Sequence, residues 1–564
     1  MTIPDAYKKV PLMYQAQTAG RSQLQYAAAA AENVERWVSE WIEKAYSNEE
    51  QWVNEPQTRT YTLNWRFVTN GGQDDGIIRP VIGAFGLPYY PGSSMKGAFL
   101  RFCTQSQGER YCGKKLEQGD SQPGILRFHG GYPTDNSWQE NLVDLVHPQQ
   151  EWQVKSNDTN QRARGETAFS LISLYEPEFK FSISSNIILD EEEWQTIWEI
   201  WQKAMVAGLG CRVSAGYGQT KLKSENIIYT AHLQGQGMAS MLLDKTPEFR
   251  PNIFKAALRG HGLRIFGGLT SAENADSLIE TLLGGVTGDG KVGLLAINWV
   301  NDEKPEYGIF NDGHPADTYK VKGELRFALT RQLPKNKQQA LTKLIKTLTR
   351  FAMVLGGFGK SWRRADHRLF YPGYYTQNQR QSLIGCHWTW GKKSLQTKSD
   401  RHNVALKLNE VTAMIEKVIS AAREWMELEN IPPLDYQQSH QNRSYANWRE
   451  SWHPAKVQVW VRIAENATDA QGLPWFHGMG NNIIYHSDLT GRMGQIGRLW
   501  HRMYPQVKFL KSNKDPNKLI HKETGKYLEL LTFFPDNSPV SEDFQKFLDE
   551  VQPYFDILWE SQPE

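Results

Sequence analysis

The sequence predicts an α+β fold in which one strand–helix unit occurs twice in succession. Residues 57–226 and 227–395 share an order of elements: an extended segment, a glycine-punctuated turn, a short basic helix, further strands, a long helix and a glycine-rich loop. Each stretch approximates βαββαβ, which is typical of ferredoxin-like and RRM-like domains, where helices back one antiparallel sheet. Long insertions separate the elements, and insertions of this length in a compact fold are usually functional loops.

The elements of the first unit follow from local patterns. Tryptophan and isoleucine recur at helical spacing in residues 191–207, which predicts a long helix packed on a core. The other predicted elements are a strand at 58–68, a helix at 94–103, strands at 168–174 and 179–188, a glycine-rich loop at 208–218 and a closing strand at 219–222.

The second unit repeats this order with different residues. Its predicted elements are strands at 228–234, 292–299 and 321–329, helices at 252–266 and 337–354, and a glycine-rich loop at 356–362.

We therefore divide the chain into four regions. An N-terminal helical arm (1–56, with a helix at 27–45) precedes the first domain (57–226), whose thumb insertion covers about 108–166. The second domain (227–395) is followed by a C-terminal extension (396–564), which either stands alone or belongs to the second domain. In this extension we expect a helix at 403–425 and a strand at 457–463, and we assign it no function.

Composition describes a globular chain without an overall preference for nucleic acid. The 564 residues are 40% hydrophobic and 22% charged, and 64 Lys and Arg against 62 Asp and Glu leave a net charge of +2. Any basic surface must therefore be local. The sequence has no secretory signal and no membrane-spanning run, and its four cysteines form no CxxC pair. We expect a cytoplasmic protein that does not associate with a membrane.

The segment LPYYPGSSMKGAFLR at residues 87–101 carries the most chemical information. A proline–glycine turn precedes Ser93 and Ser94, either of which is able to cap the helix that follows. A helix N-terminus with free backbone N–H groups, close to Lys96 and Arg101, is suited to binding an anion. An ordinary capped helix with solvated basic residues explains the same sequence, so the pattern alone does not decide between an anion site and a structural helix.

This segment closely resembles the signature of the RAMP superfamily, the CRISPR-associated proteins that line guide RNA in type III effector complexes. Two further segments match in the expected order. RGETA at residues 164–168 is similar to the sequence after the family's thumb insertion, and GLGCRVSAGYG at 208–218 is similar to its terminal glycine-rich loop. The three motifs lie within about residues 58–223.

The second unit resembles the same superfamily less closely. EFRPNIFKAALR at residues 248–259 looks like the variant helix motif with an acidic–aromatic–Arg–Pro lead-in, and LGGFGKSWRR at 355–364 looks like a glycine-rich loop with trailing arginines. The chain thus resembles a tandem fusion of two Cas-seven-type backbone domains, like the fused subunits of some type III-D effectors.

The resemblance implies four partners: guide RNA, target RNA, other RAMP-type subunits and a large effector subunit. Residues 360–407 agree with an RNA partner, because ten Lys or Arg against two acids are interleaved there with aromatic residues that are able to stack on bases. A solvated face with core aromatics is the alternative. The candidate RNA contacts are Ser93, Ser94, Lys96, Arg101, Arg164, Arg212, Lys255, Arg259, Arg264, Lys360, Arg363 and Arg364.

Asp74 and Asp75 raise the question of catalysis. In RAMP subunits that cleave RNA, an aspartate between the first strand and the Pro-Gly-Ser-Ser helix supports metal-dependent cutting, so the resemblance implies Asp75, with its neighbour Asp74, as the catalytic position. A carboxylate there is able to hold a divalent cation, for which we expect Mg²⁺. A polar turn, GGQDDG, explains the same residues.

Two other functions stay open. The chain is a non-catalytic scaffold of the same complex if both units only bind RNA. It is a stand-alone guide-RNA-processing endoribonuclease if a general base lies near a first helix, and His261 is the candidate for that base.

Overall fold

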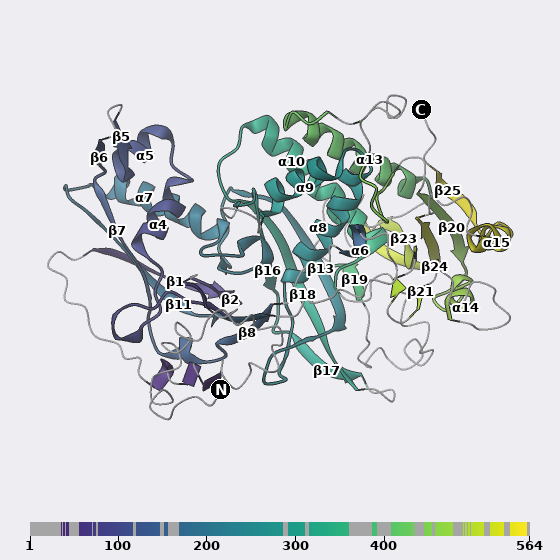
Figure 1. Cartoon of the computed structure of the whole chain (residues 1–564), viewed down its shortest axis with the longest axis horizontal. Coiled ribbons are helices and arrows are strands. Elements are labelled where there is room, and N and C mark those ends of the chain that lie inside the picture. The colour runs from purple at the N-terminus through teal and green to yellow at the C-terminus, as the bar shows by residue number, and fades with distance from the viewer. Residues whose placement is uncertain are drawn as a thin grey trace, which may run out of the picture.

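The computed structural model has a mixed α+β architecture, with the sheets arranged one after another along the long axis of the molecule (Figure 1). None of the helices in the described part of the chain has both the length and the apolar character required to span a bilayer. The structure describes residues 35–36, 38–39, 41–43, 56–69, 71–74, 77–116, 120–146, 152–155, 169–285, 291–310, 315–359, 386–391, 408–432, 434, 445–453, 457–477, 489, 491–492, 495–496, 498–511, 519–534 and 542–560.

Four antiparallel strands form the sheet of the first unit, in the order β12-β1-β11-β7. Helices α4 and α7 share one apolar core with this sheet, and the ring centroids of Trp201 and Phe181 lie 5.1 Å apart in it. The predicted helix at 191–207 is confirmed. The elements are β1 (Gln57–Asn64), α4 (Gly92–Leu100), β7 (Leu126–Pro133), β11 (Glu178–Ser185), α7 (Glu191–Ala207) and β12 (Gln219–Thr220).

Strand β7 corrects the predicted thumb insertion at 108–166, because it lies inside that range and pairs with β11. Its sequence, LRFHGGYP, lacks a strand signal since two adjacent glycines interrupt it. Packing requires these glycines. A Cβ at Gly131 would lie 2.5 Å from the ring of Phe181, and Gly130 has a φ of +89° beside the carbonyl of Tyr90.

The predicted strand at 168–174 is also corrected, because it does not join the main sheet. Residues 169–172 form β9, which lies in a small separate sheet with the order β3-β4-β9-β8, and Leu174 begins β10, which pairs with β2. The other strands and α-helices between residues 57 and 226 are β2 (Arg66–Phe67), β3 (Gly72–Asp74), β4 (Ile77–Arg79), α5 (Gln105–Cys112), β5 (Gly113–Lys115), β6 (Ser121–Pro123), β8 (Val143–Val146), α6 (Trp152–Lys155), β9 (Phe169–Ile172) and β10 (Leu174–Tyr175).

The second unit builds a sheet with the path β16-β18-β13-β19, to which β17 adds at β18. The predicted strands and helices are confirmed, with ends that differ by a few residues. The elements are β13 (Ile227–Met238), β14 (Ser240–Met241), β15 (Pro247–Glu248), α8 (Asn252–Gly267), α9 (Ala272–Leu283), β16 (Leu295–Asn301), β17 (Glu306–Phe310), β18 (Ala316–Leu329), α10 (Lys335–Phe351) and β19 (Cys386–Trp390).

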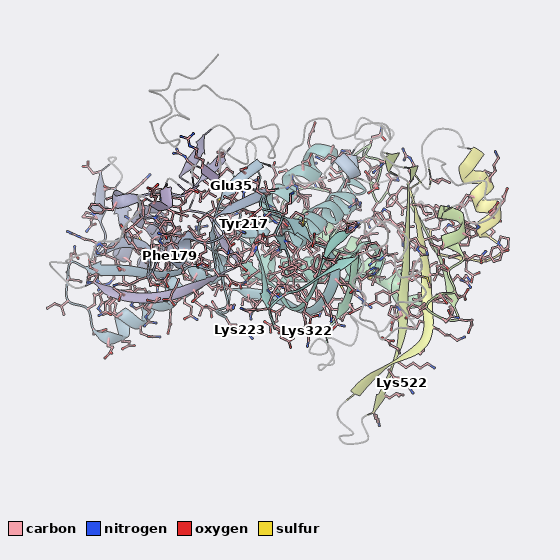
Figure 2. All side chains as sticks on the ribbon, turned by 90° about the horizontal axis from the view of Figure 1, so that it is seen from below. Glu35, Phe179, Tyr217, Lys223, Lys322 and Lys522 are labelled. Carbon is pink, nitrogen blue, oxygen red and sulfur yellow. The ribbon has the colours of Figure 1, made fainter. Side chains whose placement is uncertain are left out.

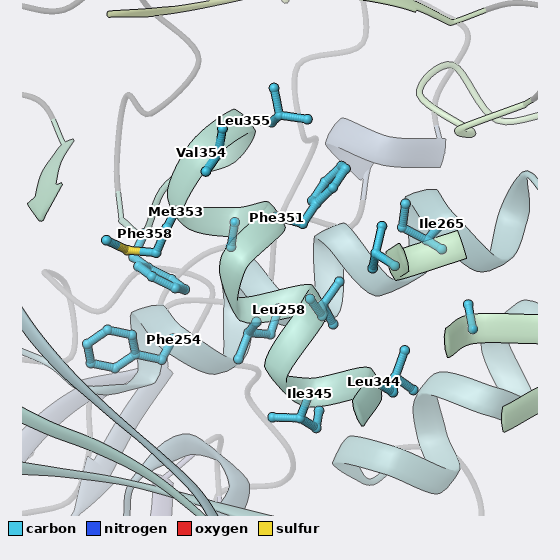
Figure 3. Close-up of a cluster of buried hydrophobic side chains, with 14 of the residues drawn as sticks. Phe254, Leu258, Ile265, Leu344, Ile345, Phe351, Met353, Val354, Leu355 and Phe358 are labelled. Atoms are coloured by element: carbon cyan, nitrogen blue, oxygen red, sulfur yellow. The ribbon is translucent and has the colours of Figure 1, made fainter. Parts of the chain in front are cut away.

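Apolar side chains of α8 and α10 face one another in the core of this unit (Figure 3). The core also receives Trp388 and Trp390 of β19, which are 4% and 7% exposed. These tryptophans belong to the basic segment 360–407, where the sequence suggested aromatic residues that stack on bases. For these two residues the core interpretation is the correct one.

The C-terminal region contains a third sheet, with the order β23-β24-β20-β25. The predicted helix at 403–425 and the strand at 457–463 are confirmed as α13 and β20; the other strands and helices were not predicted. The elements are α13 (Leu408–Leu428), β20 (Gln458–Ala464), α14 (Gly472–His477), β21 (Gly491–Arg492), β22 (Gln495–Ile496), β23 (Leu499–Lys511), β24 (Leu519–Phe533), α15 (Glu542–Val551) and β25 (Asp556–Glu560).

All three main sheets have the same topology. When the four strands of each βαββαβ unit are numbered in chain order, the first sheet has the order 4-1-3-2, and the second and third have the order 2-3-1-4. These are one order read from opposite edges. In each copy one helix (α4, α8 or α14) lies between the first and second strands, and another (α7, α10 or α15) between the third and fourth. The structure therefore contains three copies of one topology where the sequence predicted two.

The second and third sheets are joined by a common apolar core and by a buried ion pair. Arg264 of α8 donates from Nε to Glu450 Oε2 at 2.7 Å, and the two side chains are 3% and 0% exposed. Within the third sheet, Glu529 accepts hydrogen bonds from Gly472 N at 2.7 Å and Arg462 Nη1 at 2.8 Å, which fixes the start of α14. Burial raises the pKa of Glu529, but the hydrogen bond from His501 and the other donors outweigh it and lower the pKa below its ordinary range.

Candidate nucleic-acid interface

The Pro-Gly-Ser-Ser segment begins α4 at Gly92, and Pro91 is its N-cap. Ser93 and Ser94 therefore lie in the first turn, exposed, and neither caps the helix as the sequence suggested. A proline is favourable at this boundary because it brings an extended backbone, here with φ of −61° and ψ of 142°, directly to the first helical residue. The first-turn N–H groups of a helix lack intrahelical acceptors, so this end of α4 retains its capacity for an anion.

Close packing against β7 explains the glycine of this segment. A Cβ at Gly92 would lie 2.1 Å from the carbonyl oxygen of Phe128. Met95 and Phe99, both 0% exposed, bury the opposite side of the helix in the core of the first unit. The start of α4 is therefore held directly on the sheet and cannot shift without a clash.

The solvent side of α4 is basic and polar. Lys96 and Arg101 are exposed, and neither forms an ion pair with another described residue. Arg101 Nε donates to the carbonyl oxygen of Gly97 at 3.3 Å, which keeps its guanidinium along the helix. Together with Ser93 and Ser94 these residues form the α4 surface, an exposed polar strip of a helix whose other side is buried.

The glycine-rich loop at 208–218 lies beside the ends of β1 and β2. Gly210 has a φ of +72°, and a Cβ there would be 2.1 Å from the carbonyl oxygen of Val68. Arg212 has a φ of +60° and is half-buried, so its backbone adopts the left-handed region that favours glycine. Tyr217, in contrast, is 1% exposed and points into the protein.

Tyr217 belongs to a buried polar network that joins the first unit to the second. Its hydroxyl donates to Asp144 Oδ2 at 2.7 Å and accepts from Arg250 Nη2 at 2.9 Å. Arg250 also pairs with Asp144 Oδ1 at 2.5 Å, and Arg66 Nε donates to Glu248 Oε1 at 2.8 Å. We call these five residues the joint network; all are less than a tenth exposed.

Charge balance stabilises the joint network. Two guanidinium groups face two carboxylates, so the buried cluster is neutral when all four groups are ionised. Burial raises the pKa of Asp144, but the neighbouring Arg250 and Arg66 outweigh it and hold that pKa below its ordinary value of 3.8. Burial raises the pKa of Glu248, with Asp144 adding to the rise, even though Arg66 opposes it.

The acidic–aromatic–Arg–Pro lead-in of the second unit is thus an element of the interface between units. Glu248 and Arg250 of this motif contact residues of β2, β8 and the glycine-rich loop of the first unit. Sequence analysis noticed the motif but not this role, because Asp144 and Tyr217 lie 106 and 33 positions away from Arg250 along the chain.

Two predicted RNA contacts of the second unit are corrected by burial. The side chain of Arg264 is 3% exposed and paired with Glu450, and its guanidinium lies 5.1 Å from the ring of Trp500. Arg259 is 8% exposed and donates to the carbonyl oxygen of Gly284 at 3.4 Å. A buried, paired arginine does not reach a phosphate, so these two residues leave the candidate set. Lys255 is half-buried.

His261 is a core residue. It is 0% exposed, and its ring lies 5.5 Å from that of Phe351 and 5.9 Å from that of Trp500. A general base must reach the proton that it removes from the substrate. His261 therefore does not supply the base that the processing endoribonuclease requires.

One of the two catalytic candidates, Asp74, lies in an edge strand of the small sheet. Asp74 is the last residue of β3 and pairs with Ile77 of β4. Asp75 lies outside the described residues, as do Arg164, Lys360, Arg363 and Arg364. Within the described ranges, which do not include Asp75, no three His, Cys, Asp or Glu side chains come together to hold a metal ion.

The second sheet has a polar face that the sequence analysis did not identify. Gln234 pairs with Lys322 and Gln236 with Lys320 across β13 and β18, while the alternating residues face the core. Lys322 is exposed, and it lies on the same side of the molecule as Lys223 (Figure 2). Polar and apolar residues alternate along both strands, and this alternation, with the correct register between the strands, would have predicted the polar face.

Comparison with known proteins adds no assignment, because no family model matches the chain and no curated protein matches it.

Proposed function

We propose that this chain is a backbone subunit of an RNA-guided effector complex of the type III CRISPR class, in which ferredoxin-like domains bind the guide RNA and the guide–target duplex. The observation that carries the proposal is the threefold use of one βαββαβ strand order, combined with the α4 surface on the first copy. Domains of this topology that repeat along a chain are suited to a ligand that is itself a repeating polymer.

The first domain is the principal RNA-binding part. Its α4 surface presents two serine hydroxyls and an ammonium group in the first turns of the helix, and a guanidinium group at the C-terminal end, groups that are able to bind phosphates. Gly92 holds this surface rigidly against β7. Base pairing between guide and target would supply the sequence specificity, while the protein reads shape and phosphates.

The proposed chemistry of the complex is metal-dependent cleavage of target RNA at Asp75. This part rests on the position of Asp75 between the first strand and the Pro-Gly-Ser-Ser helix, and a divalent cation, Mg²⁺, would supply charge stabilisation at the phosphate. A scaffold without catalysis is the second candidate. The buried position of His261 speaks against the processing endoribonuclease.

A binding measurement on the full chain tests the RNA assignment. Lys96→Gln combined with Arg101→Gln is expected to weaken binding of unstructured single-stranded RNA and to lower the slope of log affinity against log salt by about 1.4, because each lost phosphate contact removes about 0.7. The method is fluorescence anisotropy over a salt series.

The matched control is Lys417→Gln with Arg423→Gln, which changes a lysine and an arginine at exposed positions of α13. This control is expected to retain the wild-type slope. Equal slopes for both double variants would remove the α4 surface from the RNA interface.

A further inference from the structure

The third sheet carries a hairpin that extends beyond the rest of the sheet. β23 and β24 pair from Leu499 and Phe533 to Lys511 and Leu519, whereas β20 accompanies β24 only as far as Tyr527. Residues 507–511 and 519–523 therefore form a two-stranded ribbon, which projects from the body of the protein with Lys522 on it (Figure 2).

The base of the ribbon is fixed to the sheet. The pairing register shifts between Pro505 and Val507, a bulge that bends the strand. Thr524 Oγ1 donates to the carbonyl oxygen of Gln506 at 3.1 Å, and Gly525 has a φ of +83°. Since an isolated two-stranded hairpin is only marginally stable in water, these contacts and the sheet behind them are needed to hold the ribbon in its direction.

The ribbon carries an unbalanced positive charge. Lys508 lies directly opposite Lys522, and both are exposed. Lys511 is exposed near the end of the ribbon, and none of the three forms an ion pair with another described residue. Glu523 is the one acidic residue in the described part of the ribbon. Like charges directly opposite each other destabilise a pair of strands, so this arrangement costs the free protein stability.

An anion that lies along the ribbon would remove this repulsion. A nucleic-acid backbone offers closely spaced negative charges, and lysines that neutralise its phosphates release bound counterions into solution. Lys508 and Lys522 point from facing positions of two strands, so their flexible side chains are able to reach neighbouring phosphates. Leu510, which is 49% exposed on the same ribbon, adds an apolar contact for a ribose or base.

We infer that the β23–β24 ribbon, through Lys508, Lys511 and Lys522, binds the sugar–phosphate backbone of RNA. This inference rests on the proposed function, which makes RNA the polyanion present, and it extends the RNA contacts to the third sheet. An acidic protein segment is the competing occupant, and the experiment separates the two.

The test uses the full chain with three substitutions, Lys508→Gln, Lys511→Gln and Lys522→Gln. Binding of fluorescein-labelled oligouridylate is expected to weaken, and the slope of log affinity against log salt is expected to fall by about 2, from about 0.7 per lost contact. The thermal midpoint is expected not to fall, because the substitutions remove a like-charge pair at exposed positions. A matched control replaces three exposed lysines elsewhere: Lys304, Lys335 and Lys417.

Each outcome decides between the alternatives. A lower slope in the ribbon variant, with a wild-type slope in the control and unchanged binding of labelled polyglutamate, supports the inference. An RNA slope equal to that of the control, or a loss confined to polyglutamate or single-stranded DNA, overturns it. A wild-type chain that binds no oligouridylate overturns the proposed function instead, so the two failures are distinguishable.

Discussion

Asp75→Ala, in an otherwise intact effector complex, is expected to abolish one discrete cut in a complementary target RNA. The carboxylate is proposed either to hold a divalent cation or to polarise the attacking hydroxyl, and the loss of such a group reduces the rate of a step by about 10²- to 10⁴-fold. Assembly and guide RNA are expected to persist, because Asp75 is proposed to act in cleavage and not in binding of the guide. Target RNA is mapped for cuts with and without Mg²⁺.

Asp244→Ala is the matched control for this experiment. Asp244 lies in the corresponding loop of the second unit, where Oδ1 accepts from Thr246 N and Oδ2 from Thr246 Oγ1, each at 2.9 Å. These bonds identify it as a turn residue, and its removal is expected to leave every cut in place. If all cuts also persist in Asp75→Ala, Asp75 is a turn residue as well, and the scaffold function replaces the catalytic one.

Arg250→Met is expected to lower the free energy of unfolding by about 3 to 5 kcal/mol, because it removes one partner of a buried ion pair in the joint network. Methionine fills part of the space but leaves Asp144, which is 0% exposed, with Arg66 as its remaining cationic neighbour. The measurement is the urea dependence of unfolding, followed by tryptophan fluorescence. Lys320→Met is the control, because its pair with Glu306 is 66% exposed on both sides and is worth about 0 to 1 kcal/mol.

The loss of stability caused by Arg250→Met is expected to depend on pH, because it depends on whether Asp144 is ionised. Burial raises this pKa, but Arg250 and Arg66 together lower it below the ordinary value of 3.8. The stability that ionised Asp144 provides is therefore fully present above 3.8 and is lost as the pH falls through the lower folded value. The difference between wild type and variant is expected to be largest near neutral pH and to shrink below 3.8. A difference that grows on acidification would contradict the role of the network.

Sequence reasoning predicted the elements whose pattern is local. Apolar residues at helical spacing predicted the helix at 191–207, and the local patterns of α8, α10 and β18 predicted those elements. It missed β7, because the glycines that packing requires there remove the usual strand signal. Beyond β20 the third sheet was missed, because the six-residue helix α14 and the strands β23 and β24 give no clear periodic pattern.

The candidate site divides in the same way. Pro-Gly-Ser-Ser chemistry is local, and the structure places Ser93, Ser94 and Lys96 together on one exposed surface. The presence of an arginine in the sequence does not show whether its side chain points to solvent or into the core. Arg264 has the spacing of a phosphate contact, but it pairs with Glu450, which lies almost two hundred positions further along the chain. The joint network depends on four such long-range contacts, so a single sequence could not reveal it.

The central claim is that this chain binds guide RNA as part of an assembly, and the RNA that co-purifies with it is the most direct test. The chain, expressed with the other subunits of its effector complex and a guide array, is purified through an affinity tag, and the bound RNA is sequenced. We predict RNA of discrete length that derives from the guide array and is protected from added nuclease. A complex without RNA, or with RNA unrelated to the array, would contradict the account.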